Sequence, residues 1–137
     1  MTVRRFEDVE FGVELPAFEP DTGIANVRRF ARAAEMMAGR FIDHAEARKE
    51  GLPGAIVPGV MSQGILAAMI HRWAPDAEIV KIDTVFRAPV MVDEPHRVSG
   101  VVTNLDAETR SIEVDLTVTN QAGETRVLGT ARVRLPG

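Results

Sequence analysis

The sequence contains no cysteine, no tyrosine and only one tryptophan. Without cysteine the chain can form no disulfide, no thiolate metal site and no cysteine nucleophile. Its few aromatic side chains offer little for stacking nucleic-acid bases, and its net charge of −4 provides no basic field for a phosphate backbone. We therefore expect no nucleic-acid partner.

Long hydrophobic runs are missing as well. The longest apolar stretch lies in the 60s and is interrupted by Ser62, Gln63 and Gly64, which leaves it too short to span a bilayer. Residues 1–8 lack the apolar core of a signal peptide. We therefore expect a cytoplasmic protein with no membrane partner.

The remaining composition is that of an ordinary globular domain. The chain has 137 residues, of which 45% are hydrophobic and 26% are charged. A domain of this length buries enough surface to fold without a metal or a disulfide. We predict one domain over residues 1–137 that needs no cofactor. We expect no metal site, because the three histidines have no ligand-like spacing.

The C-terminal half shows the alternation of half-buried strands. In residues 111–119 apolar side chains occupy every second position, and a hairpin turn with Gly123 separates this segment from a second alternating one at 127–135. Two further strands are expected at 78–87 and 95–105. We predict that the four strands form an antiparallel meander. Residues 6–15 are expected to be irregular, with at most one short strand.

Three helices are expected before these strands. Asp21 or Thr22 is the expected cap of the first, which runs through residues 27–34, and a short one covers 45–50. The third runs from Gly59 to Trp73 and is apolar on nearly every side, so we expect it to be buried all round. This order predicts an α+β fold in which a curved antiparallel sheet wraps around a central helix starting near Gly59. That is the hotdog architecture, although other α+β arrangements fit the same order.

Three segments of the chain resemble the MaoC-like hydratases and dehydratases. Residues 51–61, GLPGAIVPGVM, are similar to the family's entry into the central helix. Residues 86–90, FRAPV, resemble its turn after the next strand, and residues 6–12, FEDVEFG, resemble its N-terminal opening. The resemblance implies a hotdog domain that forms a homodimer, or a heterodimer with a related subunit. It also implies an acyl-CoA or acyl-carrier-protein thioester bound at the subunit interface.

The resemblance also implies where the chemistry belongs. Catalytic members carry an aspartate and a histidine on the loop before the central helix, and backbone N–H groups at the start of that helix polarise the thioester carbonyl. Counting back from Gly51, the two catalytic positions hold Met36 and Phe41. Neither side chain can transfer a proton, so the usual dyad is absent.

Asp43 and His44 are the nearest substitutes for the missing dyad. If the protein is an enzyme, we expect His44 to act as the general base, its ring oriented by a carboxylate. The alternative is that Asp43 caps the short helix and His44 lies in its first turn, solvated. The predicted substrate-binding residues lie in two places. Gly59 and Val60 begin the central helix, where N–H groups would meet the thioester oxygen, and Phe41 and Met36 would line the pocket for the acyl group.

The other polar groups have weaker claims to a catalytic role. Glu35 is the next candidate base, although a solvent-facing helix position is the simpler explanation for it. His71 is expected to be structural and His96, after Pro95, to lie at the surface in a turn, and Ser62 has no base beside it in the sequence.

These residues leave three functions open. We predict an acyl-thioester hydratase/dehydratase that acts on 2-enoyl or 3-hydroxyacyl thioesters. The alternative is a non-catalytic hotdog subunit that binds acyl thioesters or pairs with a catalytic partner. A hotdog thioesterase is the third option, disfavoured because no acidic residue lies between Gly59 and Trp73.

Overall fold

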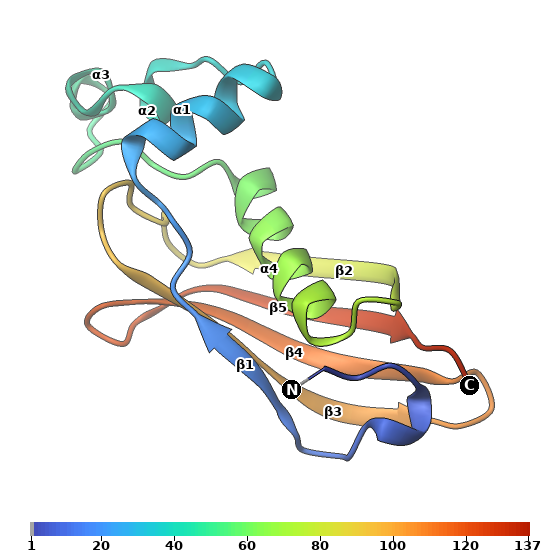
Figure 1. Cartoon of the computed structure of the whole chain (residues 1–137). Coiled ribbons are helices and arrows are strands. Elements are labelled where there is room, and N and C mark those ends of the chain that lie inside the picture. The colour runs from blue at the N-terminus through green and yellow to red at the C-terminus, as the bar shows by residue number, and fades with distance from the viewer. Residues whose placement is uncertain (1) are drawn as a thin grey trace.

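The computed structural model describes residues 2–137 and shows a curved antiparallel sheet with one long helix lying across it (Figure 1). The strands are β1 (Glu14–Phe18), β2 (Glu78–Phe86), β3 (His96–Asp106), β4 (Ser111–Asn120) and β5 (Thr125–Arg134). The helices are η1 (Phe6–Asp8), α1 (Ile24–Ala33), α2 (Gly39–Ile42), α3 (His44–Lys49) and α4 (Gly59–Trp73). The predicted α+β arrangement around a helix that begins at Gly59 is confirmed.

The core lies between α4 and the sheet. Leu66, Met69 and Ile70 of α4 are fully buried. They face the alternating apolar positions of β4, of which Val114 and Leu116 are completely buried. The alternation read from the sequence therefore identified the inner face of the sheet correctly, as a period of two requires.

The predicted four-strand meander is wrong in one respect. The sheet order is β1-β3-β4-β5-β2, so only β3, β4 and β5 form a meander, and β2 pairs with β5. The reason lies in residues 87–95, which do not turn straight back from β2. Instead, Val57 donates its N–H to the Val90 oxygen (2.8 Å), and Val92 donates to the Ala55 oxygen (3.0 Å). These contacts draw the connection toward the N-terminal half of the chain.

Helix α4 is buried on one side only, which corrects the expectation of burial all round. Val60, Gly64 and Ala68 lie on its exposed side. Gln63 donates a side-chain hydrogen bond to the Thr84 hydroxyl of β2 (2.7 Å). The small residues of the exposed side leave room between α4 and α1.

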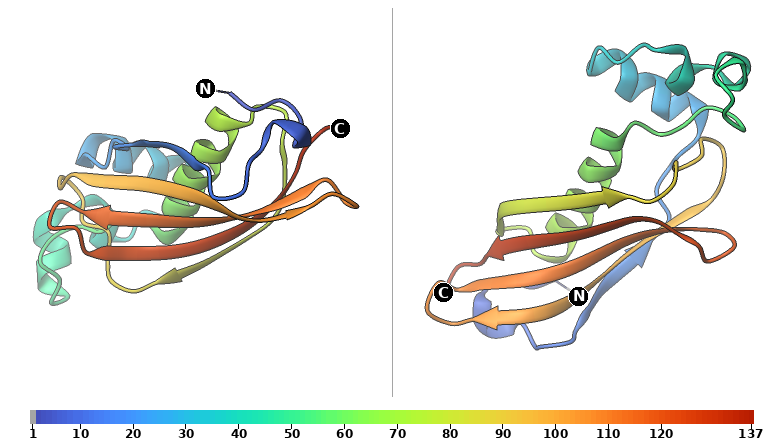
Figure 2. Two further views of the ribbon diagram at one scale, coloured as in Figure 1. Left: turned by 90° about the horizontal axis from the view of Figure 1, so that it is seen from below. Right: turned by 180° about the vertical axis from the view of Figure 1, so that it is seen from behind.

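Helices α1, α2 and α3 lie together beyond one end of the sheet, where α4 begins (Figures 1 and 2). Helix α2 was not predicted, and α1 is not capped by Asp21 or Thr22. Gly23 is its N-cap residue, and the N–H of Ile24 donates to the Asp93 carboxylate instead (2.8 Å). Within residues 2–137, no helix has both the length and the apolarity that crossing a bilayer requires.

Candidate functional site

The first turn of α4 borders a pocket of about 430 Å³. Pro58 is extended and Gly59 is the first helical residue. The first N–H groups of a helix have no acceptor within the helix, and the helix dipole adds partial positive charge there. This turn therefore suits an oxygen that carries or develops negative charge. The lining residues are Ile56, Val57, Gly59, Ser62, Phe86, Arg87, Ala88, Pro89 and Val90.

Gly59 lets an aromatic ring lie directly against this turn. A Cβ atom at this position would lie 3.0 Å from Cζ of Phe86, closer than an unstrained contact. Of the predicted substrate-binding residues, Gly59 lines the pocket. The neighbouring Val60 is 58% exposed and does not line it.

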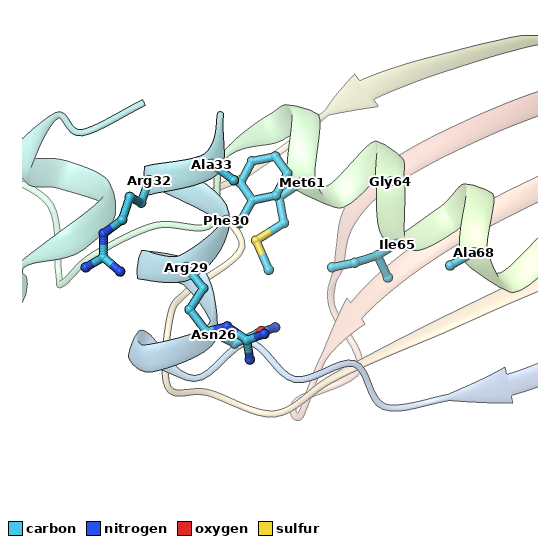
Figure 3. A pocket seen from close by; sticks show the side chains of 9 residues that line it. All are labelled: Asn26, Arg29, Phe30, Arg32, Ala33, Met61, Gly64, Ile65 and Ala68. Atoms are coloured by element: carbon cyan, nitrogen blue, oxygen red, sulfur yellow. The ribbon is translucent and has the colours of Figure 1, made fainter. Parts of the chain in front are cut away.

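A larger cleft of about 690 Å³ runs between α1 and α4 (Figure 3). Phe30 of α1 and Met61 of α4 line it near the start of α4, and Ile65 lines it farther along. Asn26 and Arg29 lie at its polar end, whereas the Arg32 side chain points away from α4. Its size and largely apolar lining are typical of sites for small organic groups.

Met36 and Phe41, which stand at the positions of the missing dyad, lie outside both cavities. Met36 follows α1 and donates its N–H to the Ala31 oxygen (2.8 Å), while Phe41 lies in α2. Both side chains are half-buried. In the single chain, neither lines the cavity in which an acyl group is expected.

Asp43 caps α3. Its carboxylate accepts the N–H of Glu46 (3.0 Å), and this bond is the main reason that the pKa of Asp43 is lowered from its ordinary value. The contacts of Asp43 therefore agree with the alternative interpretation, in which it caps the helix. Its position as the cap places the next residue, His44, in the first turn of α3.

His44 has both ring nitrogens in hydrogen bonds. Its Nδ1 accepts the N–H of Ala55 (2.9 Å), so the ring proton must be on Nε2, which donates to the Asp93 carboxylate (2.7 Å). The side chain is 29% exposed, so it is less solvated than the alternative assumed. The ring is oriented by a carboxylate, and that carboxylate belongs to Asp93.

Asp93 connects three segments of the chain. It accepts hydrogen bonds from His44 and from the N–H of Ile24, and these bonds, the histidine's first, lower the pKa of Asp93. It also has φ of +66°, a left-handed conformation that is uncommon for residues other than glycine. Two hydrogen bonds to its side chain offset the cost of this conformation.

The two remaining histidines lie elsewhere. His71 is at the end of α4, where its Nε2 lies 3.2 Å from the Ala77 oxygen. The expectation that His96 lies at the surface is wrong: it begins β3, where it is 2% exposed, and its Nδ1 donates to the Glu94 oxygen (2.9 Å). Glu35 is exposed in the turn after α1. In the part of the chain that the structure describes, no three His, Cys, Asp or Glu side chains gather as metal ligands would.

Sequence reasoning missed Asp93, Ala55 and Gly54. A Cβ atom on Gly54 would lie 2.9 Å from Nδ1 of His44, so this glycine makes room for the ring. The glycine is visible in the sequence, but its partner is not. Asp93 lies 49 residues from His44 and in a turn, where an acidic residue is ordinary.

Comparisons with known proteins bear on the family and the fold. A family model described as "MaoC like domain" matches residues 41–124. The (R)-hydratase from A. caviae is similar in structure, with a TM-score of 0.89 and 22% identity over 95% of this chain and 99% of that one. R-hydratase PhaJ1 from Pseudomonas aeruginosa gives 0.89 and 20% identity over 96% and 85%.

A chain of the ChsH1-ChsH2 complex from Mycobacterium tuberculosis gives a TM-score of 0.85 and 20% identity over 93% of this chain and 98% of that one. No curated protein sequence matches. At these identities the structural likenesses establish the fold, and they agree with the predicted hotdog architecture.

Proposed function

Because the chain belongs to the MaoC-like domain family, we propose that it binds acyl thioesters and acts in their hydration or dehydration. The observation that carries this proposal is the first turn of α4, where Gly59 borders a pocket beside unpaired helix N–H groups. The (R)-hydratase of A. caviae and PhaJ1 share this fold. The substrates would be 2-enoyl and 3-hydroxyacyl thioesters.

The proposed reaction needs two kinds of group. In hydration the oxygen of water bonds to C3, a proton is added at C2, and the double bond between C2 and C3 becomes single. Negative charge develops on the thioester oxygen during this step, and the N–H groups at Gly59 and Val60 are suited to stabilise it. The cleft between α1 and α4 would take the acyl chain, and the exposed Arg29 and Arg32 near it suit the phosphates of coenzyme A or of a carrier protein.

The second requirement is an acid–base group. Asp43 and His44 stay the predicted catalytic residues, with Met36 and Phe41 as predicted contacts of the acyl group. For His44 to take a proton at Nδ1, that nitrogen must first release the N–H of Ala55. If His44 proves not to be the base, Glu35 is the next group to test.

A second candidate function has its own observation. Met36 and Phe41 stand where the family resemblance places the aspartate and histidine, so a binding subunit that pairs with a catalytic partner is the alternative. ChsH1-ChsH2 is a complex of two different chains. A homodimer or a heterodimer in the cytoplasm is proposed in either case. A thioesterase is the third option, although α4 carries no acidic residue.

An assay of the purified protein with crotonyl-CoA distinguishes the three functions. Loss of the enoyl absorbance with the protein alone supports the hydratase. Activity that appears only after a homologue carrying the aspartate and histidine is added supports the binding subunit. Release of free thiol instead supports the thioesterase. If the protein neither turns over nor binds enoyl, hydroxyacyl or saturated acyl thioesters, the proposed function is wrong.

A further inference from the structure

A series of hydrogen bonds runs from the start of α1 to Ala55, in the segment that leads into α4. The N–H of Ile24 donates to Asp93 (2.8 Å), the Nε2–H of His44 donates to the same carboxylate (2.7 Å), and the N–H of Ala55 donates to Nδ1 of His44 (2.9 Å). Ala55 is buried and is followed by Ile56 and Val57, which line the pocket at Gly59. This series of hydrogen bonds therefore ends one residue before Ile56, the first residue of the pocket wall.

The residues around Ala55 are held by burial and by backbone hydrogen bonds. Ala55 and Val57 belong to the buried core. Ile56 donates its N–H to the Arg40 oxygen (2.8 Å), Val57 donates to the Val90 oxygen (2.8 Å), and the Ala55 oxygen accepts the N–H of Val92 (3.0 Å). The bond to His44 is the one contact of Ala55 N–H to a side chain, and Gly54 leaves room for that side chain.

From this arrangement we infer that His44 and Asp93 form a positioning pair, which sets the place of the thioester-binding turn of α4 by holding the backbone N–H of Ala55. The inference rests on the proposed function of that turn. Asp93 orients the ring and fixes its proton on Nε2, so Nδ1 keeps a lone pair for Ala55. In this role, which replaces the general-base role predicted from the sequence, His44 acts through the segment 55–59 and does not touch the substrate.

Two substitutions separate this role from that of a general base. Asparagine places its Oδ1 two bonds from Cβ, as histidine places Nδ1, so His44→Asn keeps an acceptor for Ala55. Glutamine places its Nε2 three bonds from Cβ, as histidine places its own Nε2, so His44→Gln keeps a donor for Asp93. Neither variant can serve as a base. His71→Asn is the matched control, because His71 lies at the far end of α4.

The experiment measures the affinity of each full-length variant for a non-hydrolysable butyryl-CoA thioether, together with amide hydrogen exchange over residues 55–60. We expect His44→Asn and His71→Asn to bind within about threefold of the unchanged protein. We expect His44→Gln to bind about tenfold or more weakly, with faster exchange at Ala55, because it leaves a buried N–H without its acceptor. Where crotonyl-CoA is turned over, the same difference appears in KM.

Two results would overturn the inference. One is equal affinity and equal exchange in His44→Asn and His44→Gln. The other is loss of turnover in both variants with unchanged affinity, which assigns His44 as the base. Nitrogen chemical shifts of the His44 ring in the unchanged protein need no variant: a protonated Nδ1 also contradicts the inference. If the unchanged protein binds no thioether, the proposed function fails, whereas exchange and ring shifts still decide the role of His44.

Discussion

Gly54 and Gly59 serve the site in the same way at two places. Each lets a ring lie closer to the backbone than a Cβ atom would allow: His44 at Gly54 and Phe86 at Gly59. Neither glycine has a positive φ, so the backbone itself suits any residue. The demand at both positions comes from the neighbouring ring, and substitutions there should change the site more than the fold.

Gly59→Ala tests this directly. The added methyl group must push the Phe86 ring away, because its nearest atom would lie 3.0 Å distant. We expect binding of the butyryl-CoA thioether to weaken about tenfold, with little change in melting temperature, since Phe86 is 48% exposed and can move. Phe86→Leu in the same chain should restore part of the affinity. Unchanged affinity in Gly59→Ala would show that the turn does not bind the thioester.

Asp93 makes stability depend on pH in a defined direction. Its hydrogen bonds, from His44 first and then from Ile24, lower its pKa below the ordinary value of 3.8. A lowered folded-state pKa contributes stability that is present above the unfolded pKa and is lost as pH falls through the folded one. The side chain is 46% exposed, so the contribution is modest.

Asp93→Asn should therefore be less stable than the unchanged protein at about pH 5, and the difference should shrink toward about pH 3. Asparagine tolerates the left-handed backbone at this position, and its Oδ1 can still accept the N–H of Ile24. The main change is therefore the loss of the negative charge and of the hydrogen bond from His44. Melting temperatures of both proteins across this range measure the effect. A difference that grows as pH falls would contradict the role assigned to Asp93.

At the scale of the elements, local signals in the sequence predicted the ends of α3 and α4 well. Asp43 caps α3, which was one of its two interpretations, and α4 runs from Gly59 to Trp73 as expected. The prediction that Asp21 or Thr22 caps α1 was wrong, because the acceptor of the Ile24 N–H is Asp93, 69 residues away. The predicted position of β2 in the sheet was wrong for a similar reason, since hydrogen bonds between residues 90–92 and 55–57 direct the chain after β2. Periodicity and capping signals contain no information on such distant partners.

The two roles considered for Asp43 predict different behaviour of two variants. Asparagine also caps helices, so Asp43→Asn should keep the melting temperature, whereas Asp43→Ala should lower it. If Asp43 acts only as the cap, Asp43→Asn also keeps the affinity for the thioether and any turnover. Loss of turnover in a stable Asp43→Asn protein would instead support the catalytic prediction.

At the scale of the whole molecule, the sheet has one long open edge. Strand β2 is bonded to β5 on one side only, and it exposes Val80, Val85 and Phe86. An open apolar edge favours association with another chain, which completes the hydrogen bonds of the strand. Because Phe86 also lines the pocket at Gly59, a partner along β2 would lie beside that pocket. A partner chain could then bring an acid–base group to a site that lacks the usual pair.

Lysines on this edge should prevent such pairing. Charged side chains on an edge strand oppose pairing with a second strand, so we expect Val80→Lys with Val85→Lys to convert a dimer into a monomer. Light scattering at micromolar concentration measures the mass. Phe11→Lys is the control, because Phe11 is 72% exposed but lies away from β2, and it should leave the dimer intact. If the unchanged protein is a monomer both alone and with a homologue carrying the aspartate and histidine, β2 is not an interface, and the acid–base group must come from this chain.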